Sequence, residues 1–305
     1  MELKLTAPQD CIGDFTYNFL WQHKGDKLNP TGTIPGTSYS YKDIVETLKK
    51  GEDVHIDGDS GKRLGSSLGV DLFYFGGNGK ELPDVGSILV DGNADSHLGI
   101  SMLSGSIYVS GEVKEPLGNV VQVKSDLDGY KKFVSVTWLL HHPEGMDSIL
   151  APNKFKEGEL LLNDGVLRHT LAARCHSEIK VRVNGDVGIS VGILMRKGCV
   201  LVAGNAGMNA AALLNGGKVV ILGDAAEFLA VELRKGIVFV KGECKGYVGA
   251  KMTGGQIICR KTKPIPPVKE KVLGRDDQGL LAQFGISGVL TMNYGKYEVS
   301  IPEQK

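Results

Sequence analysis

Residues 185–224 read GDVGISVGILMRKGCVLVAGNAGMNAAALLNGGKVVILGD, and this stretch decides the fold. Its glycines could surround a bound phosphate, or they could turn the corners of a structure built by repetition. Gly185, Gly204, Gly223 and Gly242 stand 19 residues apart, three times in succession. Self-similarity at a short fixed period is the sequence signature of a solenoid. The spacing therefore favours corners over a phosphate site.

Several other positions recur when each of these glycines is counted as position 0. Position 1 is Asp, Asn or Glu, position 7 is Gly or Ala, position 10 is Met or Leu, and position 13 is glycine again. Positions 15 and 17 are apolar, which is the alternation of a β-strand that points every second side chain inward. Positions 6, 8 and 10 alternate in the same way and predict a second strand.

The period predicts an all-β chain folded as a parallel β-helix, or β-solenoid, of about 19 residues per coil. Identical positions then stack in ladders about 4.8 Å apart. Glycine suits the corners, where the backbone needs a positive φ or a close approach. The expected structural corners are Gly58, Gly92, Gly111, Gly185, Gly204, Gly223 and Gly242 at position 0, and Gly198, Gly217, Gly236 and Gly255 at position 13.

The repeat also defines the domain organisation. It spans residues 50–260, with an insertion at 124–157 between two blocks of coils. Residues 1–49 are expected to be an irregular capping segment, and 261–305 a tail with a short helix that starts near Asp276 or Asp277. A further helix is expected at 41–50, leading into the first coil.

Composition narrows the partners and the compartment. The 35 basic residues balance the 35 acidic ones, which argues against a nucleic-acid partner. The five cysteines are odd in number and form no Cys-x-x-Cys pair, which suits a reducing cytoplasm. The N-terminus does not read as a secretory signal, and no apolar run is long enough for a membrane helix. We expect a soluble, cytoplasmic protein.

One motif suggests catalysis. Residues 65–69, GSSLG, fit the Gly-x-Ser-x-Gly elbow of serine hydrolases, so Ser67 is the one catalytic candidate. In the repeat, however, Ser67 falls at position 9, which is expected in the middle of a strand and facing outward, whereas an elbow needs a sharp turn before a helix. The dinucleotide fingerprint fails on spacing, and the glycines lead into another strand where that fingerprint needs a helix.

The densest metal-ligand types are His141-His142 and Cys175-His176. Neither has the spaced pairs that a closed zinc site usually requires, so no metal site is predicted. Cys259 fills an inward ladder position and is expected in the core.

Position 16 is apolar although it should point outward. An exposed stripe of stacked apolar side chains would be a liability unless it is covered. Either the chain's own non-repeating segments cover it or another protein does, and we treat it as the predicted partner interface. Its members are Leu89, Tyr108, Leu201, Val220, Phe239 and Ile258.

The run from Gly185 to Gly255 resembles the glycine-repeat (GXGXG) β-helix family, which includes the C-terminal domain of the large glutamate synthase subunit and the β-helix subunit of formylmethanofuran dehydrogenase. The resemblance covers both repeat blocks, although Ala226 and Lys245 replace the usual second glycine. It implies a right-handed β-helix that supports catalytic neighbours and carries no active-site residues itself.

The resemblance therefore implies a scaffold subunit of a multisubunit oxidoreductase, most similar to the β-helix subunit of formylmethanofuran dehydrogenase in one-carbon metabolism and methanogenesis. Such a chain binds no cofactor, and its protein partners carry the molybdenum or tungsten pterin and the iron–sulfur clusters. The first alternative is the β-helix subunit of a glutamate synthase-like complex, whose partners supply flavin and iron–sulfur centres. The second is a serine esterase that uses Ser67.

Overall fold

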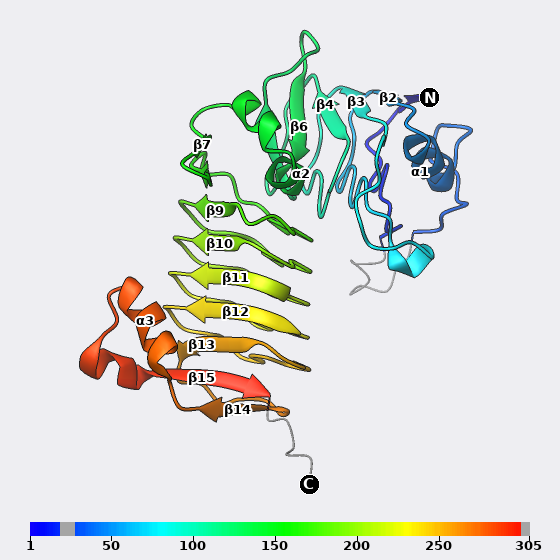
Figure 1. Ribbon diagram of the computed structural model, residues 1–305. Coiled ribbons are helices and arrows are strands. Elements are labelled where there is room, and N and C mark those ends of the chain that lie inside the picture. The colour runs from blue at the N-terminus through cyan, green and yellow to red at the C-terminus, as the bar shows by residue number, and fades with distance from the viewer. Residues whose placement is uncertain (19–27, 300–305) are drawn as a thin grey trace. The chain divides into compact units, whose positions relative to one another are not determined.

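The computed structural model describes residues 1–18 and 28–299, and short parallel strands dominate it (Figure 1). The chain divides into two compact units. Unit 1 is Met1–Lys154 with Val166–Leu171, and unit 2 is Phe155–Gly165 with Ala172–Lys305. Residues 19–27 and 300–305 of the two predicted terminal segments lie outside the described residues.

Unit 2 contains the glycine repeat that begins at Gly185. Val200, Val219, Val238 and Ile257 are aligned on neighbouring parallel strands, each 19 residues after the last. This register confirms the predicted parallel β-helix and its period. In sheet order, the strands are β14 (Val268–Lys271), β15 (Tyr294–Val299), β13 (Gln256–Arg260), β12 (Lys235–Val240), β11 (Asn215–Ile221), β10 (Cys199–Val202), β9 (Lys180–Val183), β8 (Glu159–Leu162) and β7 (Lys154–Lys156).

Unit 1 is built in the same way from fewer coils. Its sheet order is β1 (Glu2–Lys4), β2 (Val54–Asp57), β3 (Ile88–Asp91), β4 (Ser106–Val109), β6 (Lys131–Ser135) and β5 (Val120–Val123). Among its described residues, the helical elements are α1 (Tyr41–Lys49), η2 (Phe73–Phe75), α2 (Val136–His141) and η3 (Pro143–Ser148).

The first residues of the chain form a coil that the sequence did not reveal. Strand β1 pairs in parallel with β2, and the amides of Cys11 and Phe15 donate to the carbonyls of Lys62 and Ser66 in the next coil. Ile12 and Phe15 are buried in the same core as the apolar face of α1. This coil lacks the glycine signature, so the 19-residue period does not extend to it.

The predicted helices are present at both ends of the chain. Ser40 is the N-cap of α1, and Ser40 and Asp43 form a capping box, with the Ser40 amide 2.8 Å from Asp43 Oδ2. Helix α3 (Arg275–Gln283) has the two predicted carboxylates, Asp276 and Asp277, in its first turn, and Asp277 accepts a hydrogen bond from the Gly274 amide at 2.8 Å. A 3-10 helix, η4 (Gly288–Asn293), comes after it.

In the coils that begin at Gly204, Gly223 and Gly242, glycine at position 0 is required by the contact with the preceding coil. A Cβ added to Gly223 would lie 2.6 Å from the carbonyl oxygen of Gly204 and 2.5 Å from Oδ1 of Asn205. Cβ atoms in a close-packed interior are not found so near other heavy atoms, so any side chain would push the coils apart. At position 13 a positive φ adds to the close contact: Gly217 has φ 76° and a Cβ there would lie 2.7 Å from the Gly198 carbonyl oxygen, and Gly255 has φ 75°.

The polar side chain at position 1 ties successive coils together. Asp186 Oδ1 accepts a hydrogen bond from the Asn205 amide at 2.7 Å, and Asn205 Oδ1 accepts one from the Asp224 amide at 2.9 Å. Asp224 Oδ1 in turn accepts from the Glu243 amide at 2.8 Å. These recurring carboxylates and amides therefore bond at corners, as expected, and do not form a carboxylate cluster.

Positions 4 to 9 form consecutive tight turns, so the prediction of a second strand at positions 6, 8 and 10 was wrong. Asn209, Ala211 and Leu213 have φ of 59°, 56° and 54°, so every second residue is left-handed. Ala211 donates its amide back to Val191 at 2.7 Å, while Leu213 donates forward to Val231 at 2.8 Å. Apolar residues at positions 6, 8 and 10 are also typical of a strand, so the sequence pattern could not separate the two; in the structure, Ala210, Ala211 and Ala212 are all buried.

Both parallel ladders end in an antiparallel hairpin. In unit 1, β6 pairs antiparallel with β4 and with β5, and in unit 2, β15 pairs antiparallel with β13 and with β14. The edge strand β14 exposes Lys269, Glu270 and Lys271, and charges of this kind discourage pairing with another sheet. The hairpins therefore end each ladder. The sequence pattern had predicted an irregular segment as the cap.

Alanine at Gly223 should destabilise unit 2, whereas alanine at Gly185 should not. Overpacking at Gly223 is expected to lower the free energy of unfolding by about 1–3 kcal/mol. No atom lies within 4 Å of a Cβ built at Gly185, so its substitution should change that free energy by less than about 0.5 kcal/mol. Urea unfolding followed by circular dichroism measures both, and equal losses would contradict the role of coil contact.

Candidate functional site

The C-terminal segment covers most of the apolar stripe in unit 2. Val220, Phe239 and Ile258 are at most 1% exposed and share one cluster with Leu281 of α3. The rings of Phe239 and Phe284 stack with their centroids 5.1 Å apart. A partner could reach these three stripe residues only if the segment moved away, so the chain itself occupies this part of the predicted interface.

The hairpin of unit 1 covers the matching residue there. Tyr108 is 6% exposed, and its hydroxyl donates to Asp126 Oδ1 at 2.8 Å. Lys132 Nζ lies 5.1 Å from the centre of its ring. Two stripe residues, Leu89 and Leu201, are only partly buried.

The histidines and cysteines singled out in the sequence make ordinary contacts. His141 Nδ1 lies 3.4 Å from Glu81 Oε2, and the ring of His142 stacks on Trp138 at 4.7 Å. The thiol of Cys175 is buried and donates to the carbonyl of Ser177 at 3.8 Å. Across residues 1–18 and 28–299, no group of three or more His, Cys, Asp or Glu side chains is placed to hold a metal ion.

Ser67 is buried, which corrects the expectation that it faces outward. It is 0% exposed, with φ 52°, in one of the left-handed turns. Its Oγ has no hydrogen-bond partner among the described residues, and its amide donates to Ile100 at 2.6 Å. A substrate cannot reach this hydroxyl, and no base activates it within the described part of the chain, so the elbow needed for ester hydrolysis is not formed.

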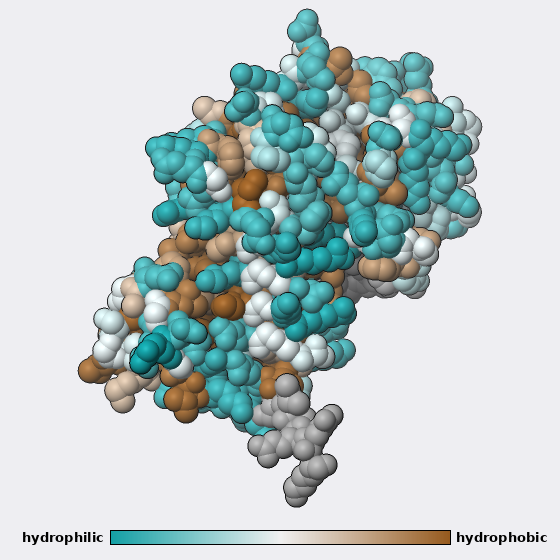
Figure 2. Space-filling model, in the orientation of Figure 1, coloured by the Kyte–Doolittle hydropathy of each residue, from teal (hydrophilic) through white to brown (hydrophobic). Residues whose placement is uncertain are grey.

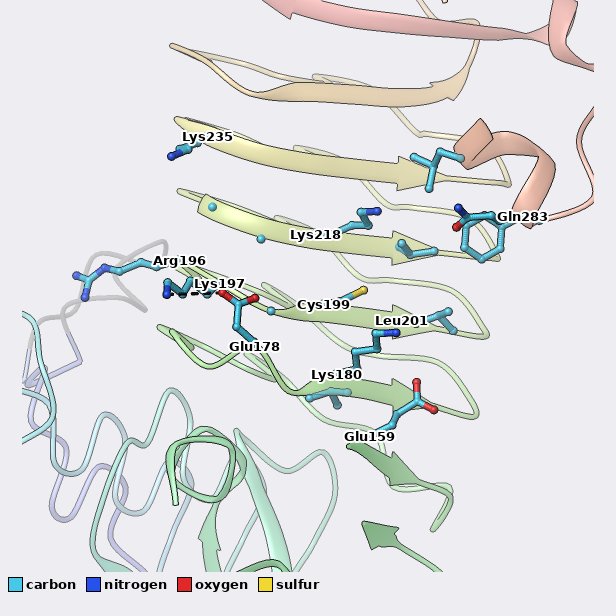
Figure 3. A pocket seen from close by; sticks show the side chains of 17 residues that line it. Glu159, Glu178, Lys180, Arg196, Lys197, Cys199, Leu201, Lys218, Lys235 and Gln283 are labelled. Atoms are coloured by element: carbon cyan, nitrogen blue, oxygen red, sulfur yellow. Dashed lines mark ion pairs between the residues drawn. The ribbon is translucent and has the colours of Figure 1, made fainter. Parts of the chain in front are cut away.

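A groove on the outer face of unit 2 is the strongest candidate site (Figure 3). It lies between strands β9–β11 and helix α3 and has a volume of about 650 Å³, within the range of small-molecule sites. We call it the basic groove. The residues that line it are Glu159, Glu178, Lys180, Val181, Arg196, Lys197, Gly198, Cys199, Leu201, Gly216, Gly217, Lys218, Val220, Lys235, Leu280, Gln283 and Phe284.

A ladder of three side chains forms the middle of the basic groove. Lys180, Cys199 and Lys218 are register partners on β9, β10 and β11, and Figure 3 shows them on one face of successive strands. Burial raises the pKa of the Cys199 thiol, while the positive charges of Lys218 and Lys180 act to lower it. Both ammonium groups therefore act on the space around this thiol.

The two ends of the basic groove differ in polarity. Arg196, Lys197 and Lys235 lie toward the starts of the strands, away from Gln283 of α3 (Figure 3). At the other end, the side chains are apolar, with Leu201 and Val220 on the sheet, Leu280 on α3 and Phe284 at the C-cap of α3. Gly198, Gly216 and Gly217 also line this site, and the backbone of the neighbouring coil fills the space that a Cβ at each would take.

The sequence contains a partial signal for this groove. Counted in the same register, position 14 holds Cys199, Lys218 and Ile237, and Lys180 aligns with them in the structure. Position 14 therefore varies in character from coil to coil, and its lysines do not stand out as a repeated feature. Helix α3, which supplies the apolar wall, could not be placed from the period because it lies outside the repeat.

Two short loops expose large apolar side chains. In unit 1, Phe73 and Tyr74 of η2 are 67% and 62% exposed. In unit 2, Val289 and Met292 of η4 are 79% and 70% exposed, and Leu290 lies between them at 56%. Brown surface marks apolar residues on the C-terminal segment in Figure 2. Clustered apolar exposure of this kind is typical of protein–protein contact.

The helices in the described part of the chain are all too short or too polar to span a membrane. No protein-family model matches the chain.

The chain is 51% identical over 286 residues to an uncharacterized protein of Methanothermobacter thermautotrophicus, and the match covers 94% of this chain and 92% of that protein. Among solved structures, it matches a chain of the formyltransferase/hydrolase complex (FhcABCD) from Methylorubrum extorquens in complex with methylofuran. That match has 14% identity and a TM-score of 0.30, and covers 93% of this chain and 88% of the other. A score of 0.30 is too low to compare sites.

Alanine at Ser67 should stabilise the protein and leave any ester hydrolysis unchanged. The substitution removes a buried hydroxyl without a partner, so the free energy of unfolding is expected to rise by about 1 kcal/mol. Urea unfolding and turnover of 4-nitrophenyl acetate by the wild type and the variant measure the two effects. Ser66→Ala is the control, because the Ser66 hydroxyl does bond, to the Arg63 carbonyl at 3.0 Å. Loss of ester turnover in Ser67→Ala alone would contradict this conclusion.

Proposed function

This chain belongs to the same family as the uncharacterized protein of Methanothermobacter thermautotrophicus, and we propose that it is a non-catalytic scaffold subunit that docks other proteins. Within that class, we propose a subunit of a multisubunit oxidoreductase of one-carbon metabolism, similar to the β-helix subunit of formylmethanofuran dehydrogenase. The stacked glycine, small-residue and Val-x-Val positions of the repeat support this, because they carry the resemblance to the glycine-repeat β-helix family. The pterin-bound metal, iron–sulfur clusters or flavin would then belong to the partners.

The apolar exposure of the η2 and η4 loops is the observation that carries the scaffold proposal. The chain covers its own stripe at Val220 and Phe239 yet leaves Phe73, Tyr74 and Val289 more than half exposed. Aromatic side chains contribute much of the binding energy in protein interfaces. Because the stacked coils hold the ends of these loops, little conformational entropy of the backbone is lost when a partner binds. The exposed apolar side chains would therefore be pre-organised for docking.

Partner capture tests the proposal. The tagged full-length chain, purified from the organism that encodes it, is expected to elute in a stoichiometric complex with subunits that carry redox cofactors. Partners with a pterin-bound metal would support the formylmethanofuran dehydrogenase-like assignment, and flavin-containing partners the glutamate synthase-like alternative. Recovery of the chain alone at low salt would contradict the scaffold role.

Two loop variants test where docking occurs. Phe73→Ser with Tyr74→Ser, or Val289→Ser with Met292→Ser, should reduce partner recovery at least ten-fold and change the unfolding temperature by no more than a few degrees, because the side chains are exposed. Val272→Ser is the matched control, since Val272 is 92% exposed outside both loops. Full recovery of the complex with both double variants would refute docking through the loops while leaving the scaffold role in place.

A further inference from the structure

We infer that the basic groove of unit 2 binds a small amphiphilic organic anion, which has an apolar or aromatic body and carboxylate or phosphate groups. The inference does not depend on the scaffold role, because it concerns a ligand site in this chain alone. It rests on the charge, the shape and the backbone pairing of the groove.

Charge is the first argument. Five basic side chains and two carboxylates line the groove. Glu178 is paired with Lys197 at 3.6 Å, whereas Lys180, Lys218 and Lys235 form no ion pair within residues 1–18 and 28–299. Glu159 of β8 is the register partner of Lys180 of β9, so its negative charge reduces the positive potential only at that end of the ladder. A concave surface of one dominant sign concentrates oppositely charged ligands.

Spacing places the charge where an anion can be shared. Lys180 and Lys218 are two coils apart, roughly 9.6 Å at 4.8 Å per coil, with the short side chain of Cys199 between them. Two ammonium groups at this spacing can both reach an oxyanion seated over the thiol. Arg196 and Lys235 extend the positive surface toward the strand starts, where a second acidic group would lie.

The apolar end defines the rest of the ligand. Leu201 of the sheet and Phe284, the C-cap of α3, are only partly buried and leave apolar surface at this end, while Val220 and Leu280 are buried in the same cluster. Stacking on Phe239 holds the Phe284 ring in place, so this wall is already formed. An apolar body here would add hydrophobic contact to the electrostatic attraction, the usual division of labour in a ligand pocket.

Backbone pairing argues against a peptide as the occupant. Strands β9, β10 and β11 each have a hydrogen-bonded neighbour on both sides, so no strand edge is free to pair with an extended segment. A docked helix would need apolar contacts repeated over several turns, whereas only four apolar side chains from the sheet and α3 line one end here. A compact ligand uses the charged and apolar ends together.

Fluorescence titration of the full-length chain tests the inference. The probes are naphthalene-1-carboxylate and 1-naphthyl phosphate, with the neutral naphthalene-1-carboxamide for comparison. At least one anion should bind with a dissociation constant of about 1 mM or tighter, and at least ten-fold more tightly than the amide. Which anion binds better distinguishes a carboxylate ligand from a phosphate ligand. Equal binding of the amide, or no binding of either anion, would overturn the inference.

Variants and chemical protection locate the binding. Lys180→Gln with Lys218→Gln should weaken anion binding at least five-fold, while Lys269→Gln with Lys271→Gln, the same charge change on β14, should weaken it less than two-fold. In the wild type, the bound anion should slow alkylation of Cys199 by iodoacetamide, read by peptide mapping, and leave Cys244 unchanged. Equal losses in the two double variants, or protection of Cys244 alone, would place the anion elsewhere. An acidic peptide that displaces the probe at lower concentration than either anion would overturn the small-molecule assignment.

Discussion

The whole structure depends on how closely successive coils approach at position 0. Glycine there lets the backbone of one coil lie against the backbone of the next, where a Cβ at Gly223 or Gly242 would fall within 2.6 Å of other atoms. That approach brings the Asn205 side chain within hydrogen-bond distance of the following amide. Strand pairing, side-chain stacking and turn-to-turn bonding all follow from this spacing, because each needs the coils to stay in register.

The turns between the strands show what that register makes possible. Left-handed conformations at residues other than glycine cost about 1–2 kcal/mol each, and a single coil contains three of them, at Asn209, Ala211 and Leu213. Hydrogen bonds to both neighbouring coils offset this cost, since each inter-coil bond contributes about 1 kcal/mol. Isolated coils would lack those partners. The repeat is thus stable only as a stack, and the side chain at position 7 stays small because it lies in the core.

Much of the fold was predictable from the sequence. Glycines 19 residues apart and apolar residues at positions 15 and 17 together indicate one structure, a stack of coils with a strand in each. The turns at positions 4 to 9 were not predictable, since apolar residues at positions 6, 8 and 10 are also typical of a strand. The coil at Cys11 and Phe15 carries no repeat signature, so only its packing reveals it. Ser67 was misplaced for the first of these reasons, because the assumed strand gave it the wrong exposure.

The candidate site was harder to foresee than the fold. Lys180 and Lys218 belong to the repeat and could have been aligned in advance, but Phe284 comes from a helix that the repeat does not position. The antiparallel hairpins at the ladder ends have a wider consequence. Interior coils contact only their immediate neighbours, whereas β14 and β15 terminate the sheet whatever its length. Evolution can therefore duplicate or delete a whole 19-residue coil within unit 2 without redesigning the hairpin that ends its sheet.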